Sequence, residues 1–435
     1  MDYFPRFVDR ELDERTKAFN AINIVGPKGC GKTRSAKERC KTVIEFQDEE
    51  KREGYLNIAE TSPKLFLKNE KPILFDEWQD APKIWGTIRK DCDDHPEATG
   101  EYFLTGSTSK KIETPHTGTG RISEVVMYPM TLFEMNDSNG TVSLSRLFDD
   151  KDYDIDGSKS ALTLEDLFYI VCRGGWPRCL AISDKEAKLQ IATDYYEQIY
   201  KKDISAIDGV KRNPEWARTI LWSYARNMAT LAKKSVIFAD VNANHNMTDI
   251  TFSSYVEALE NLFVIKDIDA WTPQIRSKTA IRAAKKHVFT DQSIALAALG
   301  IKPDYFYKDL DLFGHVFENM VLRDLLAFAE LQNARVMHYS DDMGLEADAV
   351  YQLTDGRYAL IEIKTGENAI PAAEKNLLKF GEVIRKHNES ALKDKEHPGV
   401  LYREPDLLII ICANASMAYT TEKGVKIIPA GCLRD

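Results

Sequence analysis

The chain has 435 residues, of which 43% are hydrophobic and 29% charged, and its formal net charge at pH 7 is −10. This length exceeds what one ordinary core supports and predicts roughly two to four domains in a globular protein. The acidic balance excludes a protein that coats nucleic acid non-specifically, because such binding depends on an excess of Lys and Arg.

Three further features of the sequence bear on where the protein is located and on whether its cysteines form disulfides or bind a metal. No stretch approaches the ~20 consecutive apolar residues of a membrane span. The first stretch, MDYFPRFVDRELDERTKAF, is too charged for a secretion signal, so we expect a cytoplasmic protein without membrane contact. The seven cysteines are scattered without C-x-x-C pairs, which indicates neither a zinc ribbon nor a disulfide framework.

The first predicted α/β unit surrounds GPKGCGKT, Gly26 to Thr33. An apolar run, AINIVG, predicts a strand before it, and the polar run RSAKERCKTV predicts a helix after it. The stretch fits the G-x-x-x-x-G-K-[ST] pattern of a phosphate-binding loop in the context that the pattern requires. The alternative is a glycine-rich turn ahead of a lysine. The residues predicted to bind the nucleotide here are Gly26, Pro27, Lys28, Gly29, Cys30, Gly31, Lys32, Thr33 and Arg34.

Binding of a nucleoside triphosphate with Mg²⁺ requires groups from two segments of the chain, the phosphate loop and an acidic strand end. Lys32 would reach the β- and γ-phosphates, and Thr33 would place its hydroxyl on Mg²⁺. The run KPILFDEWQD predicts a buried strand that ends in two acids, at the edge where parallel sheets bind ligands. There Asp76 would hold the metal and Glu77 would orient and activate the attacking water. ATP and Mg²⁺ are therefore the expected cofactors.

Two further stretches supply candidate polar groups. GEYFLTGSTS predicts a third strand, after which Thr105 or Ser107 would contact the γ-phosphate or the attacking water; a turn that suits Gly and Ser is the alternative. Arg121 is a candidate for stabilising transition-state charge, because a guanidinium matches phosphate geometry, with an ordinary surface arginine as the alternative.

The middle of the chain reads as helical. NDSNGTVSLSRLFDDKDYDIDGSKS marks an exposed connection, and the pattern then becomes helical up to roughly Asn213. From Lys233 to Trp271, two short helices and an apolar strand predict a helix-turn-helix with a wing. The stretch 276–287 follows with a predicted DNA-contacting patch that comprises Arg276, Lys278, Arg282, Lys285 and Lys286. A solvated charged face or an interdomain contact is the alternative.

The C-terminal third carries a second possible metal site. An amphipathic helix bears Glu318, and two strand-like runs bear Asp348 and the pair Glu362 and Lys364, at the spacing of the PD-(D/E)xK nuclease core. The three carboxylates would bind Mg²⁺ and Lys364 would position water. The residues ahead of Asp348 are Glu and Ala where that motif often has proline. A salt-bridged pair on a domain that only binds is therefore the alternative.

Several stretches also resemble one known family. Gly26 to Thr33, ILFDE, FLTGS, GRI and YPMTLFEM look like the AAA-type ATPase domain of a large bacterial and archaeal family of P-loop proteins. CRGGWPR, YKKDI, IRSKTAIRAAKKHVFTDQSIALAALG and HVFENMVLRDL are also similar to it. The resemblance implies a helical segment, a winged-helix-like segment and a C-terminal domain with a restriction-endonuclease-like core after the ATPase.

Together these patterns predict an α/β P-loop domain at 1–140, a helical lid or linker at 141–213, a winged-helix-like segment at 214–285 and the C-terminal α/β domain at 286–435. The expected function is Mg²⁺-dependent ATP hydrolysis coupled to the later domains, which would contact DNA or a protein. Arg121 would act across a homo-oligomer. An ATP-regulated nuclease and a non-hydrolysing, nucleotide-gated scaffold are the alternatives.

Overall fold

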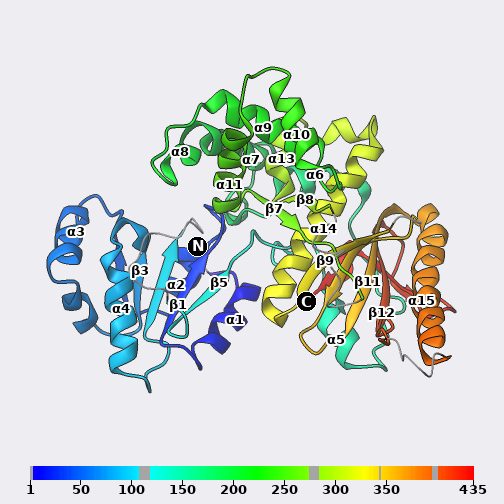
Figure 1. Ribbon diagram of the computed structural model, residues 1–435, viewed down its shortest axis with the longest axis horizontal. Helices are drawn as coiled ribbons and strands as arrows, with labels where there is room; N and C mark the ends of the chain where they lie inside the picture. The colour runs from blue at the N-terminus through cyan, green and yellow to red at the C-terminus, as the bar shows by residue number, and fades with distance from the viewer. Residues whose placement is uncertain (1–2, 107–117, 274–283, 342–343, 394–399) are drawn as a thin grey trace.

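The computed structural model describes residues 3–106, 118–273, 284–341, 344–393 and 400–435. The predicted site residues that fall outside these ranges are Ser107, Arg276, Lys278 and Arg282. Three regions are visible in Figure 1: an N-terminal sheet with helices, a helical region above it, and a C-terminal sheet beside which the long helix α14 runs.

The N-terminal region is a parallel five-stranded sheet with the strand order β2-β3-β4-β1-β5. Its strands are β1 (Ala21–Val25), β2 (Thr42–Glu45), β3 (Ile73–Asp76), β4 (Tyr102–Gly106) and β5 (Ile122–Val126). Helices α3 (Arg52–Thr61) and α4 (Lys83–Asp94) pack on one face, and α1 (Phe7–Arg15) and α2 (Lys32–Lys37) on the other. Because both faces are buried, the central strands read as continuous apolar runs. The predicted parallel α/β sheet is confirmed.

The helix after the phosphate loop is shorter than predicted. The run RSAKERCKTV suggests a helix up to residue 43, but α2 ends at Lys37 and β2 begins at Thr42. Thr42, Val43 and Ile44 are β-branched, and such side chains favour the extended backbone of a strand.

The helical region continues the chain above the N-terminal sheet. Its elements are α6 (Leu164–Arg173), α7 (Lys185–Gln198), the π-helix η4 (Ile199–Asp203), α8 (Ile204–Ala206), α9 (Pro214–Arg226), α10 (Lys234–Asn242), α11 (Asp249–Asn261) and α13 (Gln292–Leu299). Strands β7 (Ile265–Ile268) and β8 (Lys286–Phe289) form an antiparallel pair between α11 and α13. The two short helices and the strand predicted between 233 and 271 are thus α10, α11 and β7.

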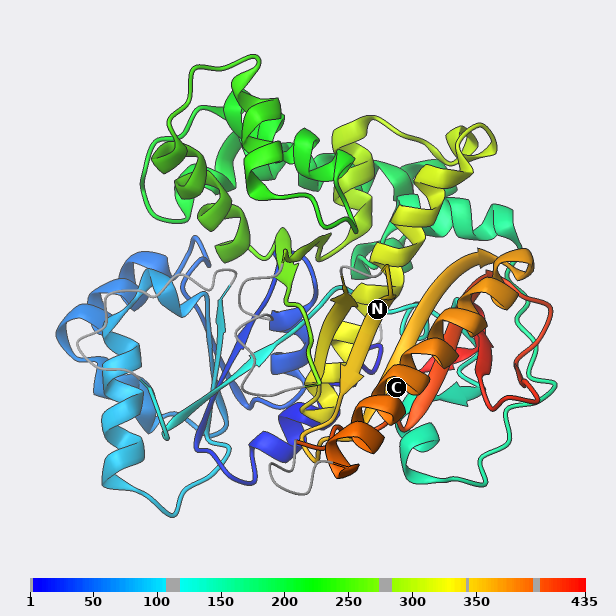
Figure 2. The ribbon, with the colours of Figure 1, turned by 45° about the vertical axis from the view of Figure 1, so that its right-hand side comes forward.

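The C-terminal region is a mixed six-stranded sheet with the order β13-β14-β12-β11-β10-β9. Its strands are β9 (Arg335–Ser340), β10 (Glu346–Gln352), β11 (Tyr358–Gly366), β12 (Leu407–Asn414), β13 (Tyr419–Thr420) and β14 (Lys426–Pro429). Helix α14 (Leu310–Gln332) packs on one face and α15 (Ile370–Lys393) on the other. Figure 2 shows α15, in orange, crossing in front of these strands.

A short segment after the N-terminal sheet joins the C-terminal region. Strand β6 (Val142–Ser143) pairs in parallel with β15 (Leu433–Arg434), and α5 (Leu144–Asp149) follows it. Arg357, next to β11, pairs with Asp149 of α5 at 3.1 Å. The start of the predicted lid or linker segment therefore packs against the C-terminal sheet. In the described part of the chain, no helix combines the length and apolar character that crossing a membrane requires.

Candidate functional site

The loop Gly26 to Thr33 joins β1 to α2 at the carboxyl edge of the N-terminal sheet. Gly26 has a φ of 150°, and a Cβ there would lie 2.2 Å from the carbonyl oxygen of Met127, so the loop requires glycine at this position. Lys32, the first residue of α2, donates its ammonium to the carbonyl oxygens of Gly26 and Pro27, both at 2.9 Å. The lysine is thus folded back over the loop.

The two predicted metal ligands lie in contact. Thr33 donates its hydroxyl to Asp76 Oδ1 at 2.7 Å, and Thr105 at the end of β4 donates to the same oxygen at 2.5 Å. Strands β1, β4 and β3 are neighbours in this sheet, so their carboxyl ends bring these side chains together. A hydroxyl and a carboxylate oxygen side by side are the donors that Mg²⁺ prefers. The chemistry of this pair fits the expected metal.

Glu77 follows β3 with a left-handed backbone, at a φ of 53°. Such a conformation is unfavourable for a residue with a side chain, and strained backbone of this kind clusters at functional sites. The Glu77 carboxylate accepts a hydrogen bond from Gln79. Glu77 lines the same cavity as Lys32 and Thr33, here called the phosphate-binding cavity. The volume of this cavity is about 570 Å³. The structure therefore brings the predicted base into the phosphate-binding cavity.

A buried arginine that the sequence did not single out supports the loop from behind. Arg6 donates to the carbonyl oxygen of Cys30 at 2.7 Å and to that of Tyr128 at 2.9 Å. Its Nε donates to Glu134 at 2.9 Å. The backbone of the phosphate loop is thereby fastened to the segment that follows β5. Cys30 itself is fully buried, in keeping with a spacer rather than a nucleophile.

The helical region reaches the loop from the opposite side. Lys28 pairs with Asp203 at 2.7 Å, and Asp203 is the last residue of the π-helix η4. A Cβ on Gly29 would lie 2.4 Å from the hydroxyl oxygen of Tyr195, on α7. Asp203, Ile207 and Leu262 complete the wall of the phosphate-binding cavity. This cavity is therefore built by two regions of the chain.

Arg121 lies away from this cavity. Strands β1 and β5 are paired in parallel register from Ala21 opposite Ile122 to Val25 opposite Val126. Arg121 precedes β5 whereas Gly26 follows β1. The two residues therefore lie at opposite ends of these paired strands, roughly 16 Å apart along the strand direction. The Arg121 side chain pairs with Asp93 at 2.7 Å. The structure does not bring Arg121 into the site of its own chain.

The C-terminal candidate residues form a ladder of alternating charge. Lys286 of β8 contacts Glu318 Oε1 at 2.5 Å and lies 4.0 Å from Asp348 Oδ1. Lys364 contacts Asp348 Oδ2 at 3.0 Å and Glu362 Oε2 at 2.5 Å. Each carboxylate is therefore separated from the next by an ammonium group.

The electrostatics of this ladder follow from its burial. Burial and the charge of Asp348 raise the pKa of both Glu318 and Glu362 to about 7. Although burial favours the neutral form of Asp348, the ammonium groups of Lys286 and Lys364 hold its pKa below the usual value.

Glu318, Asp348 and Glu362 are thus paired with Lys286 and Lys364 in this structure rather than with one another. In the described ranges, no three His, Cys, Asp or Glu side chains gather as a metal site would require. The physical reason is Lys286, which lies between the first two carboxylates, as Lys364 lies between the last two. Of the predicted DNA-contacting patch, Lys286 is buried and Lys285 pairs with Asp269 at 2.9 Å, while the other three residues lie outside the described ranges.

Sequence reasoning missed the groups that reach these sites from distant parts of the chain. They are Arg6, Tyr195, Asp203 and the Lys286 contacts. Asp203 and Lys286 lie in two stretches, YKKDI and IRSKTAIRAAKKHVFTDQSIALAALG, that the family resemblance had included. Nothing in the local pattern assigned Asp203 to the phosphate loop.

Family comparisons cover three parts of the chain. Residues 18–136 match the AAA domain family, which supports a P-loop ATPase domain in the N-terminal region. Residues 164–305 match one domain of unknown function (DUF8612) and residues 313–433 match another (DUF4143).

Among solved structures, the chain is similar to the Walker-type ATPase Paby2304 of Pyrococcus abyssi. The identity is 14% and the TM-score 0.43, over 68% of this chain and 96% of that one. Comparison with curated proteins gives no match.

Proposed function

We propose that the protein is a Mg²⁺-dependent ATPase that couples nucleotide hydrolysis to its helical and C-terminal regions. The observation that carries this proposal is the cavity in which Lys32, Thr33 and Glu77 meet, with Asp76 bonded to Thr33 behind them. The match of the surrounding residues to the AAA domain family supports it.

Each residue of the cavity has a role in this proposal. Lys32 exchanges its two loop carbonyls for the β- and γ-phosphates, while the loop N–H groups hold the remaining phosphate oxygens. Thr33 and Asp76 would hold Mg²⁺, which when bound neutralises charge on the phosphates. Glu77 orients the attacking water and takes its proton, since it lines the cavity and directly follows Asp76 at the end of β3.

ATP turnover by Glu77→Gln tests the chemistry. We expect the variant to bind ATP with Mg²⁺ like the unmodified protein, measured by calorimetry, but to lose turnover by about 10²-fold or more. Glu60→Gln, on the exposed surface of α3, is the matched control and should keep full turnover. Equal and negligible turnover in all three proteins would instead favour the non-hydrolysing scaffold. Absence of ATP binding would reject both.

The helical region supplies the route for coupling. Asp203 and Tyr195 touch the phosphate loop at Lys28 and Gly29, so a change at the loop reaches η4 and α7 directly. Loss of the γ-phosphate would then alter these contacts, as it alters switch segments in other nucleotide-binding proteins.

The later regions are proposed as interaction modules. The order α9, α10, α11 and the pair β7–β8 supports a winged-helix-like segment. Helix α11 carries Asp249, Glu257 and Glu260 and neither Lys nor Arg, which makes it unsuited to reading duplex DNA. The C-terminal sheet, with its half-buried Lys364, supports a restriction-endonuclease-like core at the level of fold only. Nuclease chemistry is not part of the proposed function, because the three carboxylates are paired with Lys286 and Lys364 in this structure.

A further inference from the structure

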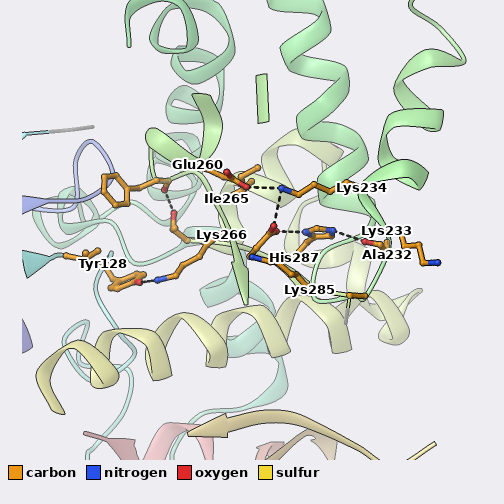
Figure 3. A pocket seen from close by; sticks show the side chains of 14 residues that line it. Tyr128, Ala232, Lys233, Lys234, Glu260, Ile265, Lys266, Lys285 and His287 are labelled. Carbon is orange, nitrogen blue, oxygen red and sulfur yellow. Dashed lines mark hydrogen bonds and ion pairs between the residues drawn. The ribbon is translucent and has the colours of Figure 1, made fainter. Parts of the chain in front are cut away.

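A second cavity lies outside the phosphate-binding site. Its volume is about 730 Å³. Its walls come from the segment after β5, the start of α10, the end of α11 and the strands β7 and β8, as Figure 3 shows. The N-terminal domain and the helical region therefore both contribute to it.

The walls carry more positive than negative groups, although the whole chain is acidic. Four lysines line the cavity, against two carboxylates, Glu260 and Asp267. Lys234 pairs with both acids at 3.1 Å, and His287 lies 2.6 Å from Asp267. Both lining acids are thus already balanced from within the cavity wall.

Two lysines are left with no carboxylate within ion-pair distance among the described residues. Lys266 of β7 donates to the hydroxyl of Tyr128, a neutral group, and its ammonium lies 5.2 Å from the centre of that ring. Lys233 is exposed at the rim, and the described structure gives it no ion pair. The charges of Glu330 and Asp269 act on Lys266 from beyond contact distance. A largely buried ammonium group that no carboxylate contacts is suited to binding an anion.

The start of α10 adds to the positive field. Lys233 occupies the cap position of this helix and makes no capping hydrogen bond through its side chain, and Lys234 is the first helical residue. Cations at a helix N-terminus oppose the helix dipole, whereas an anion there is stabilised by both the dipole and the free N–H groups. Two lysines at this position are therefore suited to an anionic ligand.

The remaining walls are apolar and aromatic. Val126, Phe263 and Ile265 line the cavity together with the ring of Tyr128. A ligand that combines a flat apolar part with phosphate would match both kinds of wall, because bases stack on aromatic rings and phosphates bind ammonium groups.

We propose that this cavity binds a nucleotide unit, with its phosphate at Lys233 and Lys266 and its base against Tyr128 and Phe263. The unit comes either from a single-stranded nucleic acid or from a free mononucleotide. The site is separate from the phosphate loop and does not depend on the proposed ATP hydrolysis.

The test uses the full chain carrying Lys32→Ala, so that the phosphate loop does not contribute. Fluorescence anisotropy with a labelled single-stranded oligothymidylate and calorimetry with thymidine monophosphate distinguish the two sources, and inorganic phosphate serves as a further probe. Lys233→Gln, at an exposed position, should weaken binding several-fold and reduce the salt dependence of log K by about 1. Adding Lys266→Met should weaken it further.

Lys201→Gln is the matched control, since this exposed lysine pairs with Glu197 outside the cavity. Binding that is unchanged by Lys233→Gln, or no binding of either nucleotide probe, overturns the proposal. Equal binding of inorganic phosphate and both nucleotide probes also overturns it, because the base would then contribute nothing. ATP turnover of Lys233→Gln with an intact loop should match the unmodified protein, which separates this site from the ATPase proposal.

Discussion

At the scale of single residues, the Lys28–Asp203 pair places an acid at the mouth of the phosphate-binding cavity. Nucleotide phosphates entering the cavity meet this carboxylate as a like charge. Asp203→Asn should therefore bind ATP several-fold more tightly in calorimetry, and Asp194→Asn on α7 is the control. Weaker binding would instead identify Asp203 as a ligand of the nucleotide. The expected change in ATP affinity is modest, because an interaction between two charges near the surface contributes only about 1 kcal/mol of free energy.

His338 of β9 predicts how stability depends on pH. Burial, together with the nearby Lys286 ammonium, lowers the pKa of His338 to about 4 from an ordinary value of 6.5. Between these pH values the unfolded chain binds a proton that the folded protein does not, so stability is lost as the pH falls from 6.5 toward 4. The loss is on the order of 3 kcal/mol at most.

The measurement is the melting temperature of the unmodified protein and of His338→Gln across this pH range. Glutamine can still donate to the carbonyl oxygen of Ala284, which His338 Nε2 contacts at 3.0 Å. We expect the unmodified protein to lose melting temperature more steeply than the variant as the pH falls. Parallel curves would show that His338 does not titrate in this way.

At the scale of elements, α14 is fastened to both other regions by one buried arginine. Arg323 pairs with Asp291 at 3.1 Å and with Asp324 at 2.7 Å. Asp291 accepts from the N–H of Gly175, ahead of α7, and Asp324 accepts from the N–H of Leu132, beyond β5. Burial raises the pKa of Asp324 to about 6 even with the arginine present.

Arg323→Met should consequently destabilise the protein by about 3–5 kcal/mol, because two buried carboxylates lose their cation. Urea unfolding followed by tryptophan fluorescence measures this. Arg335→Met, at an exposed position at the start of β9, is the control and should change stability by less than about 0.5 kcal/mol. A similar loss in both variants would contradict the central role of Arg323.

Elements built from contiguous residues could be predicted from the sequence. The phosphate loop, β3 with Asp76 at its end, and β4 are local patterns, and parallel strands bring their carboxyl ends to one edge. Lys286 could not be placed in this way. Its run of basic residues is typical of an exposed surface, and only the packing of β8 against α14 and β10 buries it between Glu318 and Asp348.

At the scale of the whole molecule, the N-terminal domain and the helical region both line the two cavities described above. Asp203 and Leu262 line the phosphate-binding cavity, while Tyr128 and Lys266 meet in the cationic one. Sequence reasoning located the loop but not the second region at its rim, because contacts between residues 28 and 203 leave no periodic or local signal.

The position of Arg121 leads to a prediction about assembly. Since Arg121 lies at the opposite edge of the sheet from its own phosphate loop, it can act on ATP only in a neighbouring copy of the chain. If it does so, Arg121→Ala lowers turnover by about 10³-fold or more. Turnover per subunit of the unmodified protein should also rise with protein concentration, because the site is completed only on assembly.

Mixing two inactive variants gives the sharper measurement. Glu77→Gln retains Arg121 but lacks the base, whereas Arg121→Ala retains the base but lacks the guanidinium. In a mixed assembly, a Glu77→Gln subunit offers its arginine to the intact site of an Arg121→Ala neighbour, so part of the turnover should return. Arg89→Ala is the control, because Arg89 pairs with the same Asp93 at 2.9 Å and should matter little. Full turnover of Arg121→Ala at all protein concentrations would show that Arg121 has no role in hydrolysis and is a surface residue paired with Asp93.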